Sequence, residues 1–176
     1  MRTKRIIYTL LVISLLVIAF FATGYLAPEN YEGERKDSFI DTQIDVWRNL
    51  TSLETITTRK PDVERVTVIE ENRDGIVLIE HLENGTQRTL RVAEREIPAY
   101  FVVEIIQSDN GLTGRWEFHL SENKDTKMTD VLIKEKSTNT NLVLRAWHTI
   151  IGRNINLRKE IKSLRVSLFQ RLLNTP

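Results

Sequence analysis

The amino-acid sequence predicts an α+β fold in which an antiparallel sheet is followed by a long C-terminal helix and preceded by one apolar helix. Three observations predict it. Residues 6–27 form an uncharged apolar run, residues 65–136 alternate apolar and polar positions between turn residues, and the last third has a helical apolar pattern. The chain of 176 residues is long enough for one domain beside the apolar run.

The apolar run, residues 6–27, has the length of a membrane span, because as a helix it would measure about 33 Å. Basic residues precede it and acidic residues follow it: Arg2, Lys4 and Arg5, then Glu29, Glu32 and Glu34. This asymmetry predicts a cytoplasmic tail (1–5), a single-pass anchor in the cytoplasmic (inner) membrane (6–27) and a domain outside. A cleaved signal peptide is the alternative, although its small-residue site, 22–24, would lie inside the apolar run.

Residues 28–34 are polar, and we expect them to form a linker or the approach to a first strand, before a domain over 35–173. Residues 42–56 are compatible with a short helix whose N-cap is Asp41 or Thr42. Turn residues at Asp74-Gly75 and Asn84-Gly85 favour hairpins. The sequence therefore predicts a meander with strands over 65–72, 76–83, 86–96, 99–107, 113–122 and 127–136.

Residues 140–173 contain no proline and fit one helix of about thirty residues. One stripe at helical spacing is apolar except for Asn154: Val143, Trp147, Ile150, Asn154, Leu157, Ile161, Leu164, Leu168 and Leu172. Trp147 is therefore expected in the core. Gly152 and Asn154 have two interpretations. Either Gly152 allows close packing and Asn154 binds a backbone group, or Asn154 and His148 line the wall of a ligand cavity.

Composition and motifs exclude several kinds of chemistry. Lys and Arg number 25 against 24 Asp and Glu, so no nucleic-acid partner is expected. There is no cysteine, and the three histidines lie on separate elements, so we expect no metal site and no cofactor. The chain has no phosphate-binding loop and no catalytic serine motif. From residue 153 on the last helix is strongly basic, which indicates a solvated face or a contact with anionic lipid head groups.

Three segments resemble the START-like (SRPBCC) superfamily, which includes polyketide cyclases/dehydrases and lipid-transfer domains. They are FIDTQIDVWRNLTSLE (39–54), VAEREIPAYFVVEI (92–105) and GLTGRWEFHLSENKDTKMTDVLI (111–133). The resemblance covers residues 34–172 and implies a helix-grip fold, in which the sheet wraps around the long helix and encloses a hydrophobic cavity. Superfamily members share no catalytic set, so the resemblance implies no catalytic residue.

The resemblance and the apolar run together imply a membrane-anchored protein that binds a hydrophobic small molecule, such as a lipid. Six residues are the candidate cavity lining: Trp116, Phe118, Trp147, His148, Ile151 and Asn154. One alternative is a cavity enzyme of the polyketide cyclase/dehydratase type, with Asn154, His148 and Arg145 as its polar groups. Another is a protein-interaction module whose core is filled.

Overall fold

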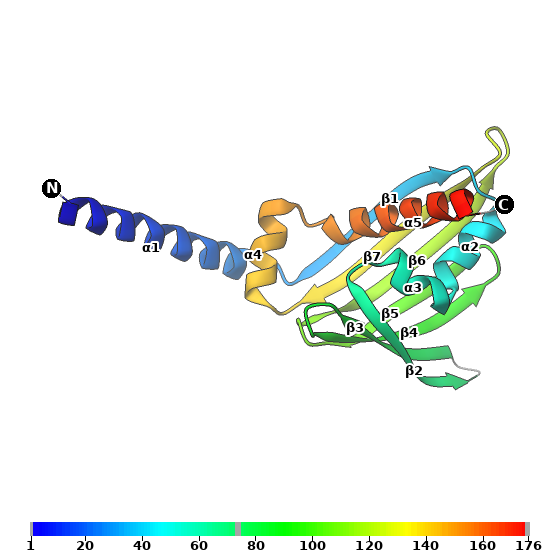
Figure 1. The fold of residues 1–176 in the computed structure, drawn as a ribbon, viewed down its shortest axis with the longest axis horizontal. Coiled ribbons are helices and arrows are strands. Elements are labelled where there is room, and N and C mark those ends of the chain that lie inside the picture. Colours follow the sequence, from blue (N-terminus) through cyan, green and yellow to red (C-terminus); the bar gives the residue numbers. More distant parts are fainter. Residues whose placement is uncertain (1, 73–74, 175–176) are drawn as a thin grey trace.

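The computed structural model describes residues 2–72 and 75–174, and this part of the chain folds into seven strands and five helices (Figure 1). The turn position Asp74 lies outside the described residues. In chain order the elements are α1 (Arg2–Leu26), β1 (Asn30–Phe39), α2 (Gln43–Thr51), α3 (Leu53–Arg59), β2 (Val63–Asn72), β3 (Gly75–Leu82), β4 (Gln87–Glu96), β5 (Tyr100–Ser108), β6 (Leu112–Asn123), β7 (Met128–Asn139), α4 (Leu142–Ile151) and α5 (Ile155–Asn174).

The strands form one antiparallel sheet in the order β1-β7-β6-β5-β4-β3-β2. All six strands predicted between residues 65 and 136 are confirmed. Gly85 has a φ of +81° in the turn between β3 and β4, a conformation that favours glycine. The first strand returns beside the last, with Asn30 opposite Thr138. Most of segment 28–34 is therefore the start of β1 and not a linker.

Helices α2, α3 and α5 cover one face of the sheet (Figure 1). Thr42 caps α2, as predicted, because its hydroxyl oxygen accepts a hydrogen bond from the Asp45 amide. The rings of Phe101 and Phe118 stack with centroids 4.3 Å apart on the inner face of the sheet. On α5 the buried side chains that face the sheet are Leu157, Ile161, Leu164 and Leu168.

The C-terminal third is two helices, so the prediction of one continuous helix was wrong. The chain turns at residues 152–154, where Gly152 has a φ of +105° and a ψ of 126°. These angles lie outside the helical region, and an L side chain would be strained there. As a result α4 leaves the line of α5, and Trp147 of the predicted core stripe is 52% exposed.

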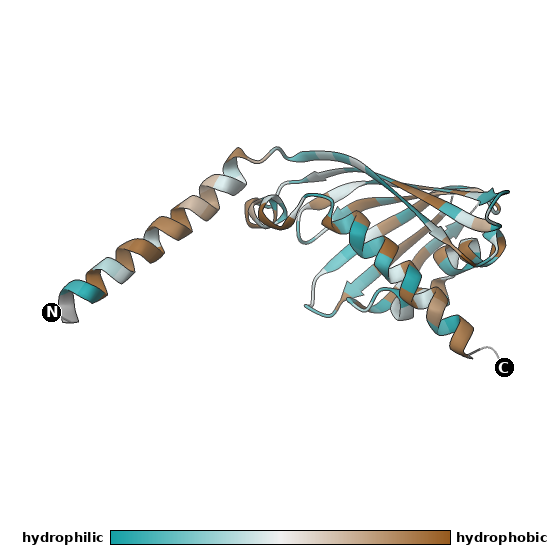
Figure 2. Cartoon of the chain, turned by 90° about the horizontal axis from the view of Figure 1, so that it is seen from above, coloured by the Kyte–Doolittle hydropathy of each residue, from teal (hydrophilic) through white to brown (hydrophobic). Residues whose placement is uncertain are grey.

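Helix α1 projects away from the sheet, and apolar residues cover most of its length (Figure 2). Its segment Lys4–Leu26 has a mean hydropathy of 2.6 and is long and apolar enough to cross a membrane. A signal sequence would have the same length and composition. The last turns of α1 pack against α4, and Gly24 lies so close that a Cβ added to it would be 2.3 Å from the Leu142 carbonyl oxygen.

Candidate functional site: a polar pocket beneath helix α4

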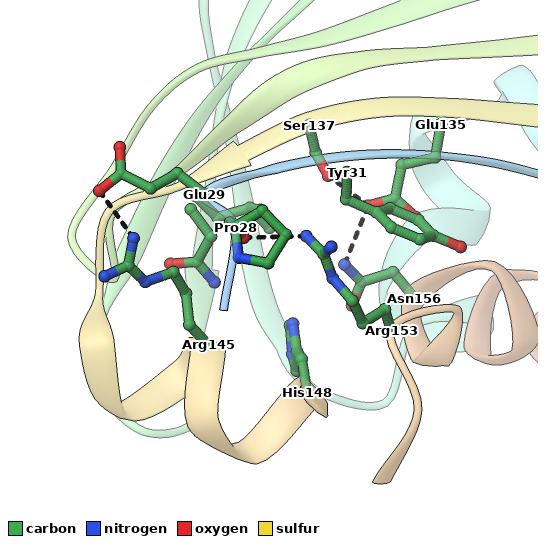
Figure 3. A pocket seen from close by; sticks show the side chains of 11 residues that line it. Pro28, Glu29, Tyr31, Glu135, Ser137, Arg145, His148, Arg153 and Asn156 are labelled. Atoms are coloured by element: carbon green, nitrogen blue, oxygen red, sulfur yellow. Dashed lines mark hydrogen bonds and ion pairs between the residues drawn. The ribbon is translucent and has the colours of Figure 1, made fainter. Parts of the chain in front are cut away.

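A small pocket lies where the start of β1 and the end of β7 meet α4 and the first turn of α5 (Figure 3). Its volume is about 20 Å³, which is room for one water-sized group. Most of its lining is polar: Pro28, Glu29, Tyr31, Leu112, Glu135, Ser137, Asn139, Arg145, His148, Arg153 and Asn156. The pocket begins two residues after α1 ends, so it lies at the end of the domain from which α1 projects.

Glu135 is the buried acid of the pocket. It lies on the inner face of β7 and is 2% exposed. Its Oε1 accepts hydrogen bonds from the Ser137 hydroxyl at 2.8 Å and from Asn156 Nδ2 at 3.1 Å. Its Oε2 is buried and has no hydrogen-bond partner among the described residues. Burial raises the pKa of Glu135, and the hydrogen bonds and nearby Arg153 offset only part of this effect.

Arg153 joins the turn after α4 to the start of β1. Its Nη2 donates hydrogen bonds to the carbonyl oxygens of Pro28 at 3.0 Å and Asn30 at 2.7 Å. Its guanidinium carbon lies 5.3 Å from the centre of the Tyr31 ring, a cation–π contact. These contacts hold the wall of the pocket next to α1.

Two further side chains have polar atoms in the pocket that lack partners. Arg145 Nη1 pairs with Glu29 Oε1 at 2.7 Å, but its Nε is buried and unpartnered among the described residues. Asn139 Oδ1 accepts from the Asn141 amide at 3.0 Å, and its Nδ2 is likewise unpartnered. With Glu135 Oε2, the pocket therefore has two donors and one acceptor unsatisfied by protein groups. Buried polar atoms in folded proteins usually have a partner, so these three indicate a bound water or ligand group.

His148 points from α4 toward the same pocket (Figure 3). Burial lowers its pKa, and the positive charges of Lys159 and Arg153 lower it further. Both effects favour the neutral imidazole, which can donate one hydrogen bond and accept another.

The structure does not bring the six predicted lining residues together. Trp116 and Phe118 are core residues on β6, 9% and 4% exposed, and neither lines the pocket. Trp147 is half exposed on the far side of α4, so its placement in the core was wrong. Asn154 is exposed in the turn between α4 and α5, and Ile151 is half-buried at the end of α4. His148 lines the pocket, as does Arg145 from the enzyme alternative.

Sequence reasoning missed Glu135, Arg153 and Asn156. Glu135 had a detectable signal, because it continues the period-two face of β7 that starts with Val131 and Ile133. An acid in register with buried aliphatic residues indicates a buried carboxyl group. Arg153 and Asn156 had no such signal. The break at Gly152 determines where their side chains point, and the sequence pattern predicted a continuous helix there.

A second group of buried charges lies between α3, α5 and the strands β3 and β4. Glu80 is 1% exposed and pairs with Lys60 at 3.2 Å and with Arg88. Burial opposes its ionisation, but Lys60 and Arg88 outweigh that effect and lower the pKa of Glu80. Arg59 forms an ion pair with Glu160 of α5. These charges lie between the sheet and α5, where the resemblance implied a hydrophobic cavity.

A broader hollow of about 470 Å³ is open to solvent over β1, β5, β6 and β7. Charged side chains along it pair with each other, Lys136 with Glu32 at 3.1 Å and Arg115 with Glu104 at 3.1 Å. Among the described residues, no group of three or more histidine, aspartate and glutamate side chains is placed to hold a metal ion.

No protein-family model and no curated protein sequence matches this chain. Solved structures do match. The Zhui aromatase/cyclase from Streptomyces sp. R1128 superposes with a TM-score of 0.65 at 13% identity, over 80% of this chain and 93% of that one. A START superfamily protein from Mycobacterium smegmatis gives 0.60 at 12% identity, over 79% and 97%. Norcoclaurine synthase from Thalictrum, in complex with a transition-state analogue, gives 0.59 at 10% identity, over 81% and 96%.

At these identities the likeness concerns the fold. The seven-stranded antiparallel sheet and the C-terminal helices of this chain match the helix-grip fold of these START-like structures. The chain therefore has an α+β helix-grip fold of the START type, with an apolar helix before it.

Proposed function

We propose that the protein is a single-pass membrane protein whose domain binds a hydrophobic small molecule or lipid and holds the polar end of that ligand in the pocket beneath α4. The observation that carries the proposal is the set of three unpartnered buried atoms in the pocket: Glu135 Oε2, Asn139 Nδ2 and Arg145 Nε. Two of the structural neighbours of this chain are named as an aromatase/cyclase and as a norcoclaurine synthase in complex with a transition-state analogue, which supports the ligand class.

The membrane anchor is α1, with the N-terminus in the cytoplasm and the domain outside the cytoplasmic membrane. Its segment Lys4–Leu26, 23 residues long, supports a span, and Lys4 and Arg5 at its start against Glu29 and Glu32 after it support the orientation. The pocket then lies next to the membrane, on the side from which a lipid would arrive.

The pocket fits one polar group. A hydroxyl group there would accept from one of the unpartnered donors, Arg145 Nε or Asn139 Nδ2, or donate its proton to Glu135 Oε2. A volume of about 20 Å³ cannot hold an acyl chain or a ring. The apolar part of the ligand must therefore enter as α4 moves, and the turn at Gly152 between α4 and α5 is where such a movement would occur.

Native mass spectrometry of the full chain, released from lipid nanodiscs, tests the proposal. We expect a co-purified adduct of lipid size that is lost in Arg145→Met. Arg165→Met is the matched control, because Arg165 also lies on a C-terminal helix and also pairs with one carboxylate, Asp37, but does not line the pocket. Apo protein without an adduct, also after incubation with a lipid extract, would instead favour the filled-core interaction module.

A second candidate function is acid–base catalysis in the same pocket, of the cyclase or dehydratase type. Glu135 favours it, because a carboxyl group with a raised pKa and a free oxygen can transfer a proton to or from a ligand. Glu135→Gln distinguishes the two functions. For a binding protein the adduct keeps its mass in the variant, whereas for an enzyme the wild type carries product and the variant carries unreacted substrate of a different mass.

A further inference from the structure

Helix α4 is amphipathic, and its orientation is the reverse of that of an ordinary surface helix. A helix on a soluble domain turns its apolar face to the core. Here the polar side of α4 faces the domain, where Arg145 pairs with Glu29 and His148 reaches the pocket. The apolar face points away, and Val143, Trp147 and Ile150 are 47%, 52% and 59% exposed.

The apolar face of α4 is next to the end of α1. Ala146, one turn from Leu142, is fully buried, and both pack around Gly24 in the last turns of α1. Helix α4 lies across the axis of α1 in Figure 1 and is seen end-on beside α1 in Figure 2. A helix that lies across a membrane span, at the point where the span leaves the bilayer, runs along the membrane surface.

The aromatic residues agree with this placement. Tyr25, in the last turn of α1, is 76% exposed, and Trp147, on α4, is 52% exposed. Tyr and Trp concentrate at the boundary between hydrocarbon and water, because an apolar ring and a polar atom are both satisfied there. The end of α1 and the apolar face of α4 therefore both expose apolar and aromatic residues near the place where the two helices pack together.

We propose that α4 lies in the bilayer interface, with Val143, Trp147 and Ile150 inserted among the lipids on the side of the membrane where the domain lies. The inference rests on the proposed anchor α1 and adds a second membrane contact to it. The bilayer is the proposed partner of this apolar face. Because α1 packs on α4, the face lies at the depth where α1 leaves the membrane. This placement of α4 also puts the side of the pocket that α4 covers within the head-group layer.

Site-directed spin labelling of the full chain in liposomes tests the inference. The chain has no cysteine, so each variant carries a single label. Labels replace Val143, Trp147 and Ile150, with Phe21 in α1 as the reference for the anchor. Phe169 is the matched control, because it is apolar and 60% exposed. It belongs to the C-terminal part of α5, and that end of the helix lies far from α1 (Figure 1). The readout is collision of each label with oxygen, which enters lipid, against collision with a water-soluble nickel complex.

We expect oxygen to dominate at Phe21→Cys, Val143→Cys, Trp147→Cys and Ile150→Cys, and nickel to dominate at Phe169→Cys. Thr149 is exposed and polar and lies outside the stripe of Val143, Trp147 and Ile150, so its label should also favour nickel and give a helical period along α4.

Three results overturn the inference and are distinguishable. If oxygen dominates at Phe21→Cys while nickel dominates on α4, the anchor stands and α4 lies in water. If nickel dominates at all positions, including Phe21→Cys, the anchor itself fails. If the α4 labels collide with neither reagent, a second copy of the chain covers this face in place of lipid.

Discussion

Gly24 in α1 lies directly against the backbone of Leu142 at the start of α4, so close that a Cβ added to it would be 2.3 Å from the Leu142 carbonyl oxygen. Backbone cannot move aside as a flexible side chain can, and a contact of this closeness between two helices requires glycine. The same Cβ would lie 3.1 Å from the Cβ of Ala146. This contact couples the apolar helix to the domain.

Gly24→Val should separate α4 from α1 and leave the sheet intact, because the contact lies outside the main core cluster. Hydrogen–deuterium exchange of the full chain in nanodiscs measures this. We expect the amides of α4 to exchange at least about tenfold faster, corresponding to about 1.4 kcal/mol of lost packing, while those of β5 and β6 stay unchanged. Ala22→Val, at an exposed position of the same helix, is the control. Unchanged exchange in α4 would contradict the coupling.

The two tryptophans that were expected to share a cavity should differ sharply in their contribution to stability. Trp116 is 9% exposed in the core, and its replacement by alanine should cost about 3–5 kcal/mol. Trp147 is 52% exposed, so Trp147→Ala should lower the free energy of unfolding of the detergent-solubilised chain by less than about 1 kcal/mol. Denaturant unfolding followed by circular dichroism compares them. Equal losses of unfolding free energy in the two variants would indicate that Trp147 is buried in the core.

Glu135→Gln should stabilise the domain at high pH and not at low pH. Burial raises the pKa of Glu135 in the folded state, so its ionisation disfavours folding. Wild-type stability therefore falls as the pH rises from the ordinary glutamate range through the raised pKa, whereas the glutamine does not titrate. We expect a gain of about 1 kcal/mol at pH 8 that disappears toward pH 4, measured by unfolding at a series of pH values.

Glu117→Gln is the matched control for Glu135. A hydrogen bond from Arg115 lowers the pKa of Glu117, so its ionised form favours folding. Its replacement should therefore reduce stability at pH 8, opposite in sign to the effect at Glu135. The same sign for both variants would show that burial of Glu135 does not determine the effect.

Glu160→Gln should be strongly destabilising, because it leaves the buried guanidinium of Arg59 without its partner carboxylate. Breaking such a pair costs about 3–5 kcal/mol. Although burial opposes ionisation, Arg59 and Lys60 lower the pKa of Glu160 to about 2. The wild-type contribution should therefore be complete above the ordinary glutamate pKa and be lost as the pH falls toward 2.

The double variant Arg59→Met with Glu160→Met tests whether pairing, and not the space that the side chains occupy, explains the loss. Two apolar groups of similar size should recover most of the stability. Chemical unfolding at pH 7 and pH 3 compares the variants with the wild type. A cost of less than about 1 kcal/mol for Glu160→Gln at pH 7 would contradict a buried pair and match an exposed one.

The sheet could be predicted from the sequence because its signals are local. Asn84-Gly85 encodes a turn, and the alternation from Ile76 to Leu82 corresponds to a strand with one buried face. The division of the C-terminal helix could not be predicted in the same way. A glycine in a helical pattern costs only about 1 kcal/mol, which a long helix tolerates. The packing of α4 against α1 at Gly24 joins residues far apart in the sequence, so a local pattern contains no sign of it.

The candidate site was predicted only in part for the same reason. His148 and Arg145 were identified as polar groups on the last helix, but the rotation of α4 after the break at Gly152 determines which side chains enter the pocket. That rotation turns Trp147 outward. Glu135 is different, because its place in the alternation of β7 was visible before any fold was known.

Only three residues separate the last residue of α1, Leu26, from the first residue of β1, Asn30. A chain of this length spans about 13 Å at most. With α1 in a membrane, as proposed, the domain therefore lies directly beside the lipid surface, without a long flexible linker. Its encounter with any molecule dissolved in that membrane becomes a search in two dimensions, at a local concentration set by the bilayer and not by the surrounding water.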